Sequence, residues 1–208
     1  MLLDILIVSV IIAFLRGGRF KRLAEIDLKR AELIVISFGI QYILVRAGES
    51  GSIWVQRWGV YLYVFSYILL LVSIWYNRHI KEMLVFGLGI ITNFMVIVAN
   101  GGHMPVSLEA LKKAGMAYLL PLLQSKTYII HTLMNPKTRL KFLADIIPLP
   151  PPYPRPRVLS VGDIIMGIGV FFLIQNYMTE KGLFKNFWRR KDDGYGFPAK
   201  KDEREKSI

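Results

Sequence analysis

The chain has 208 residues, of which 53% are hydrophobic and 12% are aromatic, and its mean hydropathy is +0.40. This composition is more apolar than that of soluble domains and indicates an integral membrane protein. The absence of cysteine excludes disulfide bonds and thiolate metal or redox sites. The formal charge of +12 favours contact with membrane lipids over nucleic-acid binding, because no basic run accompanies a recognisable RNA- or DNA-binding module.

Five apolar runs predict a bundle of membrane helices. The first run, 2–15, precedes a basic connection at 16–30, and this order is opposite to that of a cleavable signal peptide. It is shorter than the roughly 20 residues that a full span needs. The other four runs are 31–46, 58–76, 80–99 and 158–178, and Gly87 and Gly89 in the run 80–99 are expected to allow close helix packing. The sequence therefore predicts an all-α polytopic membrane bundle with about five transmembrane helices.

The region 100–157 interrupts this pattern. It opens with NGGHMPVS, whose glycines and proline end a helix, and Ser107 is then a suitable N-cap for a short amphipathic helix at 107–116. The stretch 117–134 is apolar but contains Pro, Gln, Ser and Lys, so we expect a re-entrant or interfacial segment packed on protein. The proline-rich run at 148–156 is typical of a stiff, extended linker.

Basic residues predict how the bundle is oriented. Six lie in the connection 16–30, two in 77–81 and nine after Met178, whereas eight of the remaining ten lie in the long region 100–157. Under the positive-inside rule, this distribution predicts a multi-pass cell-membrane protein with its N-terminus outside and its C-terminus in the cytoplasm.

Composition also divides the chain into two parts. Residues 1–180 are predicted to form a membrane-embedded helical domain. Residues 181–208, which are aromatic and basic at first and then highly charged, are predicted to form a basic cytoplasmic tail that is partly disordered. Within the first part, the stretch 47–57 is rich in small residues and is predicted to be a loop.

Two carboxylates in apolar surroundings are the main candidates for a site. Asp145 and Asp163 lie on either side of the proline-rich run, and a carboxylate that must lose its hydration is costly unless it has a task. The predicted topology places them on the outer side of the membrane, together with four candidate binding residues, Asn100, Gly101, Gly102 and His103. Structural explanations exist for both: Asp163 suits a helix start after Ser160, and Asp145 suits the end of a short helix before a proline turn.

If the two aspartates meet, they suit aspartyl catalysis, in which one carboxylate activates water and the other, protonated, polarises a carbonyl. FLADIIPL and VLSVGDIIMGIGVFFLI resemble the last two blocks of signal peptidase II, the lipoprotein-processing aspartyl peptidase. That resemblance implies that Asp145 and Asp163 are catalytic, that Asn100 orients the substrate and that the substrate is lipoprotein-like. Over nearly its full length, the chain resembles an uncharacterised family of bacterial polytopic membrane proteins with RGGR, NGGxMPV and IPLP…SxGD signatures, which implies no established activity.

Three classes of function therefore remain open, and whether the protein is an enzyme is one of the open questions. We favour a non-catalytic membrane subunit or lipid-interacting protein with a polar site at the outer membrane surface, which needs no cofactor and leaves a membrane protein partner as an alternative. The second class is the aspartyl peptidase. The third is a zinc or iron site built from two histidines and the two carboxylates, His103, His131, Asp145 and Asp163, although no close ligand spacing supports it.

Overall fold

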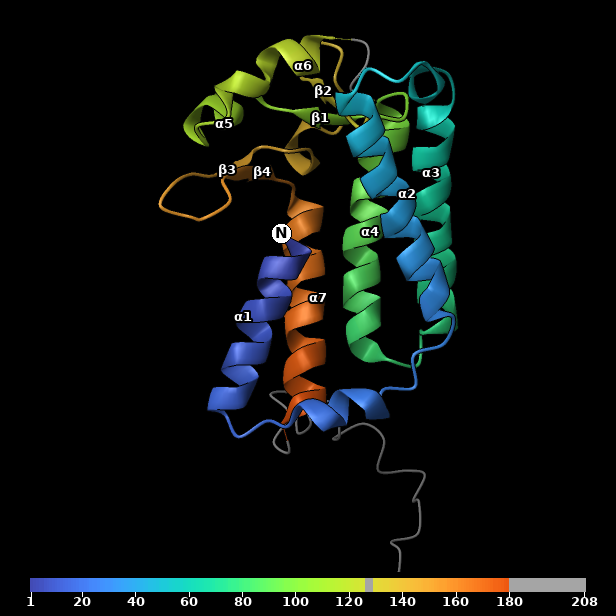
Figure 1. Ribbon diagram of the computed structural model, residues 1–208, viewed down its shortest axis with the longest axis vertical. Coiled ribbons are helices and arrows are strands. Elements are labelled where there is room, and N and C mark those ends of the chain that lie inside the picture. Colours follow the sequence, from blue (N-terminus) through green and yellow to red (C-terminus); the bar gives the residue numbers. More distant parts are fainter. Residues whose placement is uncertain (126–128, 180–208) are drawn as a thin grey trace, which may run out of the picture.

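The computed structural model describes residues 1–125 and 129–179, and five long helices in it stand side by side (Figure 1). They are α1 (Leu2–Leu15), α2 (Ala31–Glu49), α3 (Ile53–Tyr76), α4 (Lys81–Ala99) and α7 (Val161–Met178). In the described part of the chain, four of them, all except α1, are long and apolar enough to cross a membrane. The predicted fold class, a polytopic bundle of helices, is confirmed. The predicted tail at 181–208 lies outside the described residues.

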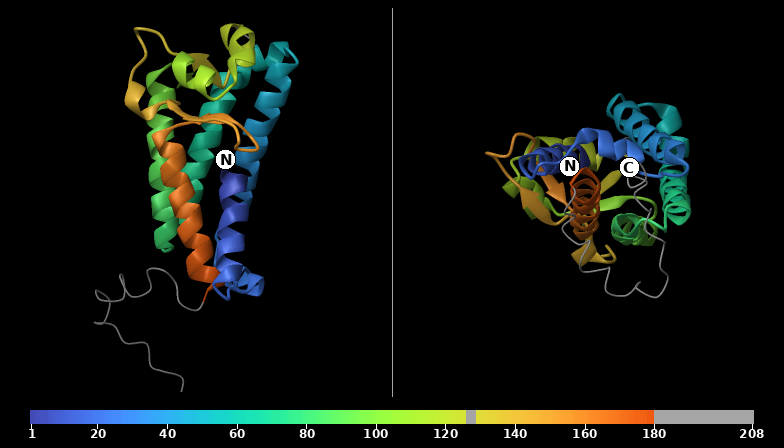
Figure 2. Two further views of the ribbon diagram at one scale, coloured as in Figure 1. Left: turned by 90° about the vertical axis from the view of Figure 1, so that its left-hand side faces the viewer. Right: turned by 90° about the horizontal axis from the view of Figure 1, so that it is seen from below.

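Between α4 and α7 the chain forms a cap over one end of the bundle, made of residues 100–125 and 129–160 (Figures 1 and 2). Its elements are β1 (Met104–Val106), α5 (Leu108–Lys113), the 3₁₀-helix η2 (Ala117–Leu119), α6 (Leu120–Gln124), β2 (His131–Leu133), the 3₁₀-helix η3 (Lys141–Leu143), β3 (Ile147–Leu149) and β4 (Arg157–Leu159). β1 pairs with β2 in parallel, and β3 pairs with β4 antiparallel. The all-helical prediction lacks these strands, because three residues are too few to show an alternating pattern.

Two predictions within the cap can be compared with the structure directly. Ser107 is the N-cap of α5, as predicted, and its Oγ accepts a hydrogen bond from the backbone N–H of Ala110 at 3.3 Å. The described parts of 117–134 form η2, α6 and β2, which lie in the cap instead of re-entering the bundle between the helices (Figure 1). The interfacial alternative for this segment stays a prediction.

The predicted loop at 47–57 is wrong in extent. α2 continues to Glu49 and α3 begins at Ile53, so only a three-residue turn at 50–52 separates the two helices. Gly51 lies in the left-handed region with a φ of +71°, which allows this tight reversal. Small residues at 47–49 therefore complete a helix, and residues 53–57 begin the next one.

The proline-rich stretch also does not run in a single direction, as a stiff, extended linker would. Residues 147–149 and 157–159 pair as β3 and β4, so the chain reverses between them. As a consequence, the last helix begins at Val161, after β4, and not at Val158 as predicted. Strand pairing fixes the point at which α7 starts.

Glycines bring α4 and α7 close together at the centre of the bundle. A Cβ atom on Gly89 would lie 2.5 Å from the carbonyl oxygen of Gly162, and one on Gly169 would lie 2.6 Å from the amide nitrogen of Phe86. Gly87 makes room in the same way for Ile74 of α3. The predicted packing role of Gly87 and Gly89 is therefore confirmed, and α1 and α2 pack outside this centre against α7 and α3.

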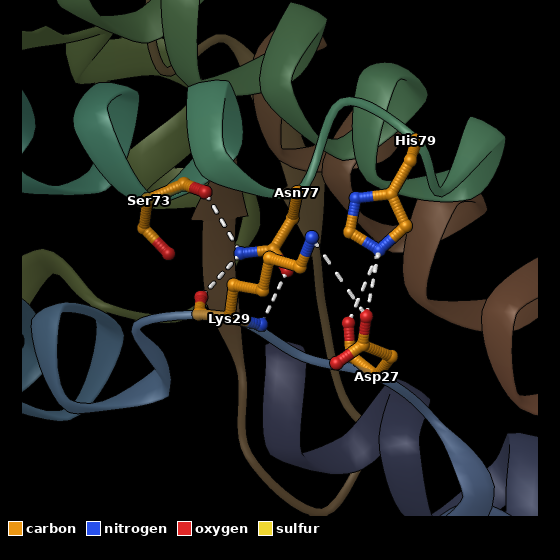
Figure 3. Close-up of polar contacts among 5 residues, drawn as sticks. All are labelled: Asp27, Lys29, Ser73, Asn77 and His79. Atoms are coloured by element: carbon orange, nitrogen blue, oxygen red, sulfur yellow. Dashed lines mark hydrogen bonds and ion pairs between the residues drawn. The ribbon is translucent and has the colours of Figure 1, made fainter.

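At the end opposite the cap, the 3₁₀-helix η1 (Phe20–Glu25) lies across the ends of the long helices (Figure 1). The connection that follows it is held by Asn77 at the end of α3 (Figure 3). The side-chain amide of Asn77 donates to the carbonyl oxygens of Lys29 at 2.6 Å and Ser73 at 2.8 Å, and its oxygen accepts from the Lys29 N–H at 2.8 Å. His79 adds a contact of 3.1 Å to the carbonyl oxygen of Asp27.

Candidate functional site

A polar cavity of about 370 Å³ lies below the cap, between α2, α3, α4 and the start of α7. Its polar lining from the helices comprises Gln41, Tyr63, Tyr67 and Asn93. The cap and the first turn of α7 add His131, Asp145 and Asp163. The structure thus brings the two predicted catalytic aspartates to one cavity.

Asp163 is held by the start of α7. Its backbone N–H donates to Ser160 Oγ at 2.9 Å, and the Ser160 N–H donates back to Asp163 Oδ2 at 3.1 Å, which makes a capping box. Asn93 of α4 donates to Asp163 Oδ1 at 3.2 Å and accepts from the Ser160 hydroxyl at 2.9 Å. Both carboxylate oxygens of Asp163 therefore have a structural partner, as the helix-start explanation requires.

Asp145 is fixed in the cap through its backbone. Its N–H donates to the carbonyl oxygen of Pro105 at 3.0 Å, and its carbonyl oxygen accepts from the Ser107 N–H at 2.9 Å. The residue follows η3 and is 5% exposed, so the predicted position at the end of a short helix is also correct. The backbone bonds leave its carboxyl group to face the cavity.

The surroundings of Asp145 and His131 shift the pKa of each group. Oδ2 of Asp145 lies 3.5 Å from Nε2 of His131. Burial raises the pKa of Asp145 well above its usual range, and the negative charge of Asp163 acts in the same direction. Burial lowers the pKa of His131 to about 4. The surroundings therefore favour the uncharged ring of His131 and the protonated form of Asp145.

The four predicted binding residues form the turn from α4 into the cap and do not line this cavity. Asn100 donates to the carbonyl oxygen of Arg139 at 3.0 Å and accepts from the Arg139 N–H at 2.9 Å, which joins the α4 end to a distant loop. Gly101 and Gly102 have φ of +72° and +90°, and Gly102 packs against Val60. His103 contacts the carbonyl oxygen of Ile129 through Nδ1.

The metal alternative finds no ligand set in the residues that the structure describes. Within 1–125 and 129–179, no group of three or more His, Asp or Glu side chains could hold a metal ion. His131 meets Asp145, whereas His103 is engaged with the backbone of Ile129. The predicted set of two histidines and two carboxylates is therefore not assembled.

The cavity residues that α3 and α4 contribute were not predicted from the sequence. Tyr63 and Tyr67 are four residues apart and so share a face of α3, and their rings make an edge-on contact with centroids 5.3 Å apart. Asn93 is a buried amide within an apolar helix. Polar side chains inside apolar membrane runs are themselves a signal for a functional site, and this signal would have indicated these residues.

Residues 25–175, which run from the connection before α2 to the last turn of α7, match DUF5317, a family of unknown function. The chain belongs to the DUF5317 family. The matched region contains every element that lines the polar cavity and leaves out α1. Membership agrees with the predicted uncharacterised family, while the signal peptidase II resemblance stays a prediction.

The comparison with curated proteins gives a relative that is also named only as uncharacterized. This protein of Thermotoga maritima is 28% identical to the chain over 171 residues, which cover 82% of the chain and 88% of the relative. No solved structure matches the chain. A function for this DUF5317 protein must therefore be argued from its own geometry.

Proposed function

We propose that the protein is a lipid-interacting membrane protein that binds an ammonium group in the polar cavity, supplied by a zwitterionic lipid headgroup or by a free amine. One observation carries this proposal: the cavity lining combines two carboxyl groups with four aromatic rings. The rings are those of Phe38, Tyr42, Tyr63 and Tyr67, and no Lys or Arg is among the described residues of the lining. Carboxylates with aromatic rings form the kind of site that attracts an organic cation.

The charge state of the cavity supports a cation as the ligand. Asp163 presents a carboxylate whose hydrogen-bond donors are uncharged, since they come from Asn93 and Ser160. Burial favours the protonated form of Asp145. A bound cation would favour its ionised form and thereby gain a second negative partner. An anion would gain neither of these interactions.

The residues that form the walls of the cavity suggest that a ligand enters it from the side of the bundle. Phe38 and Tyr42 of α2 line it on one side and Asp163 of α7 on the other, and both aromatic residues are partly exposed. Gln41 lies eight residues from the end of α2, which is a depth of about 12 Å along the helix. A lipid headgroup could occupy this level while its chains remain beside the helices. The basic connections 16–30 and 77–81 favour placing the opposite end of the bundle in the cytoplasm and the cap outside.

Binding of small amines to the detergent-purified protein tests the proposal. We expect choline, ethanolamine and tetramethylammonium to give saturable binding by calorimetry, weakened about tenfold or more in Asp163→Asn because a charged partner is lost. Asp27→Asn is the matched control, since this carboxylate is exposed at the other end of the bundle. Tyr42→Leu, on the exposed rim, serves as a second variant that leaves the capping box of α7 intact.

The outcomes separate the sources of the ammonium group. Binding of lyso-phosphatidylethanolamine with no binding of free ethanolamine assigns the site to a lipid, and equal binding of both assigns it to the amine alone. Absence of saturable binding for every ammonium compound contradicts the proposal. Equal binding by wild type, Asp163→Asn and Tyr42→Leu contradicts it as well.

A second candidate is an aspartyl hydrolase, favoured by the electrostatic interaction of Asp145 with Asp163 across one cavity. Its test is cleavage of a synthetic lipopeptide followed by mass spectrometry. Asp145→Asn would abolish cleavage by a dyad. Lack of cleavage by the folded wild-type protein, with ammonium binding present, would leave the binding function alone.

A further inference from the structure

A second, apolar groove of about 450 Å³ lies between α1 and α7, below the loop that joins β3 to β4. Ile5 and Val8 of α1 form one wall, and the α7 side chains from Ile164 to Phe172 form the other. The first and last of these α7 positions are eight residues apart, so the groove is about 12 Å long. Gly167 at its centre lets Ile5 approach the α7 backbone closely, which makes the groove narrow.

Charged residues gather at the cap end of this groove. Arg157 Nη2 lies 2.9 Å from Oδ2 of Asp4, and Arg155 Nη1 lies 3.6 Å from Oδ1 of the same carboxylate. Arg157 also interacts electrostatically with Asp163. The side chain of Arg155 is 63% exposed, and its contact with Asp4 is longer than a hydrogen bond. Arg155 therefore carries positive charge beyond what the pair of Asp4 and Arg157 neutralises.

The size of the groove decides which kind of apolar occupant fits. A helix from another protein or from a second copy has a diameter of about 10 Å with its side chains, which is wide for a groove that Ile5 narrows against Gly167. A single hydrocarbon chain is far thinner and can lie along the groove. The neighbouring excess positive charge suits a phosphate, because guanidinium groups pair with phosphate oxygens through two parallel hydrogen bonds.

We infer that this groove is a binding site for an anionic glycerophospholipid, with one acyl chain between α1 and α7 and the phosphate at Arg155. The site is separate from the polar cavity, with which its lining shares no residue, and it does not depend on the ammonium proposal. A lipid seated there would join α1, which lies outside the family match, to the cap and α7.

Lipid binding by the full-length protein in detergent tests the inference, with short-chain phosphatidylglycerol as the probe and phosphatidylcholine of equal chain length for comparison. Arg155→Gln removes the proposed phosphate partner without touching the ion pair of Arg157 and Asp4. Val8→Trp fills the groove from an exposed position, and Val35→Trp on α2 is the matched control because it is exposed and lies outside the groove.

We expect saturable binding of phosphatidylglycerol that is weakened about tenfold in Arg155→Gln, lost in Val8→Trp and unchanged in Val35→Trp. Thermal unfolding of each variant without lipid confirms that it is folded. Equal binding by the wild type, Arg155→Gln and Val8→Trp would overturn the inference. Equal affinity of the wild type for phosphatidylcholine and phosphatidylglycerol would overturn the proposed preference for an anionic headgroup. Tyr42→Leu, at the rim of the polar cavity, leaves this binding unchanged, which separates the test from that of the polar cavity.

Discussion

Nε2 of His131 lies 3.5 Å from Oδ2 of Asp145 at the wall of the polar cavity. Burial disfavours the charged form of each group, so it raises the pKa of Asp145 and lowers the pKa of His131 to about 4. The same loss of hydration opposes an ion pair between them. The two groups are therefore expected to have opposite effects on the pH dependence of stability.

Asp145 should make the protein less stable as the pH rises. The folded protein keeps this carboxyl group protonated, whereas the unfolded chain loses the proton above the ordinary pKa of 3.8. The free energy of unfolding should therefore fall above that pH, by about 1.4 kcal/mol per pH unit, until the raised pKa is reached. Thermal unfolding in detergent at pH 4 to 8 checks this. The stability of Asp145→Asn relative to that of the wild type should increase as the pH rises. A variant less stable than the wild type at pH 8 would show that Asp145 is ionised and paired.

His131 should act in the opposite direction over a lower range. Its pKa of about 4 in the folded protein lies below the ordinary value of 6.5, so the unfolded chain binds the extra proton between these values. This group contributes stability above pH 6.5 that is lost as the pH falls toward 4, which offsets the slope from Asp145 in that window.

Nuclear magnetic resonance of labelled histidines measures this pKa directly, with His131→Gln to assign the signal. The His131 signal should titrate near pH 4, and Asp145→Asn should leave the titration almost unchanged because the carboxyl group is neutral. A large fall of the pKa in Asp145→Asn would indicate an ion pair instead.

Asn77→Ala should loosen the end of the bundle opposite the cap (Figure 3). The side chain is fully buried and bonds both the N–H and the carbonyl oxygen of Lys29, so its loss leaves two backbone groups without a protein partner. We expect a loss of about 2–4 kcal/mol in the free energy of unfolding, seen as a lower thermal midpoint and faster proteolysis in the connection before α2. His79→Ala, at an exposed contact, should cost less than about 1 kcal/mol. Similar losses in the two variants would refute a special role for Asn77.

Gly89→Ala should separate α4 from α7. The added Cβ would lie 2.5 Å from the Gly162 carbonyl oxygen and 2.7 Å from the Met166 amide nitrogen, and backbone atoms of a packed helix cannot move aside cheaply. We expect destabilisation of about 1–3 kcal/mol. Gly39→Ala is the control, because a Cβ there meets nothing within 4 Å and alanine favours a helix by up to about 1 kcal/mol. Thermal midpoints that fall for both variants, or for neither, would contradict the close contact.

Local physical signals made much of the architecture predictable. Apolar runs of membrane length gave the long helices, because a span has to satisfy its backbone within itself. Ser107 and Ser160 marked two helix starts through their capping geometry, and Gly87 and Gly89 marked close packing. The limits of the loop at 47–57 could not be read in this way, since small residues suit a helix end as well as a turn.

The site depended more on contacts between distant parts of the chain. Asp145 and Asp163 were candidates from the sequence, and the structure brings both to one cavity. Asn93 reaches Asp163 across 70 positions. His131 meets Asp145 because both β2 and the backbone of Asp145 pair with β1. In the turn at 100–103, Asn100 joins the end of α4 to the cap, and the expected binding role of this turn stays a prediction.

By itself, the sequence determined that this chain is a bundle of apolar helices and that two of its carboxylates lie in apolar surroundings, because hydrophobic runs, caps and glycines act over a few residues. Only the tertiary structure decided which polar side chains face one another and what surrounds each of them. The polar cavity and the α1–α7 groove both arise where elements far apart in the chain meet. The protonation of Asp145 and His131 depends on the same packing, because it is burial that shifts their pKa values.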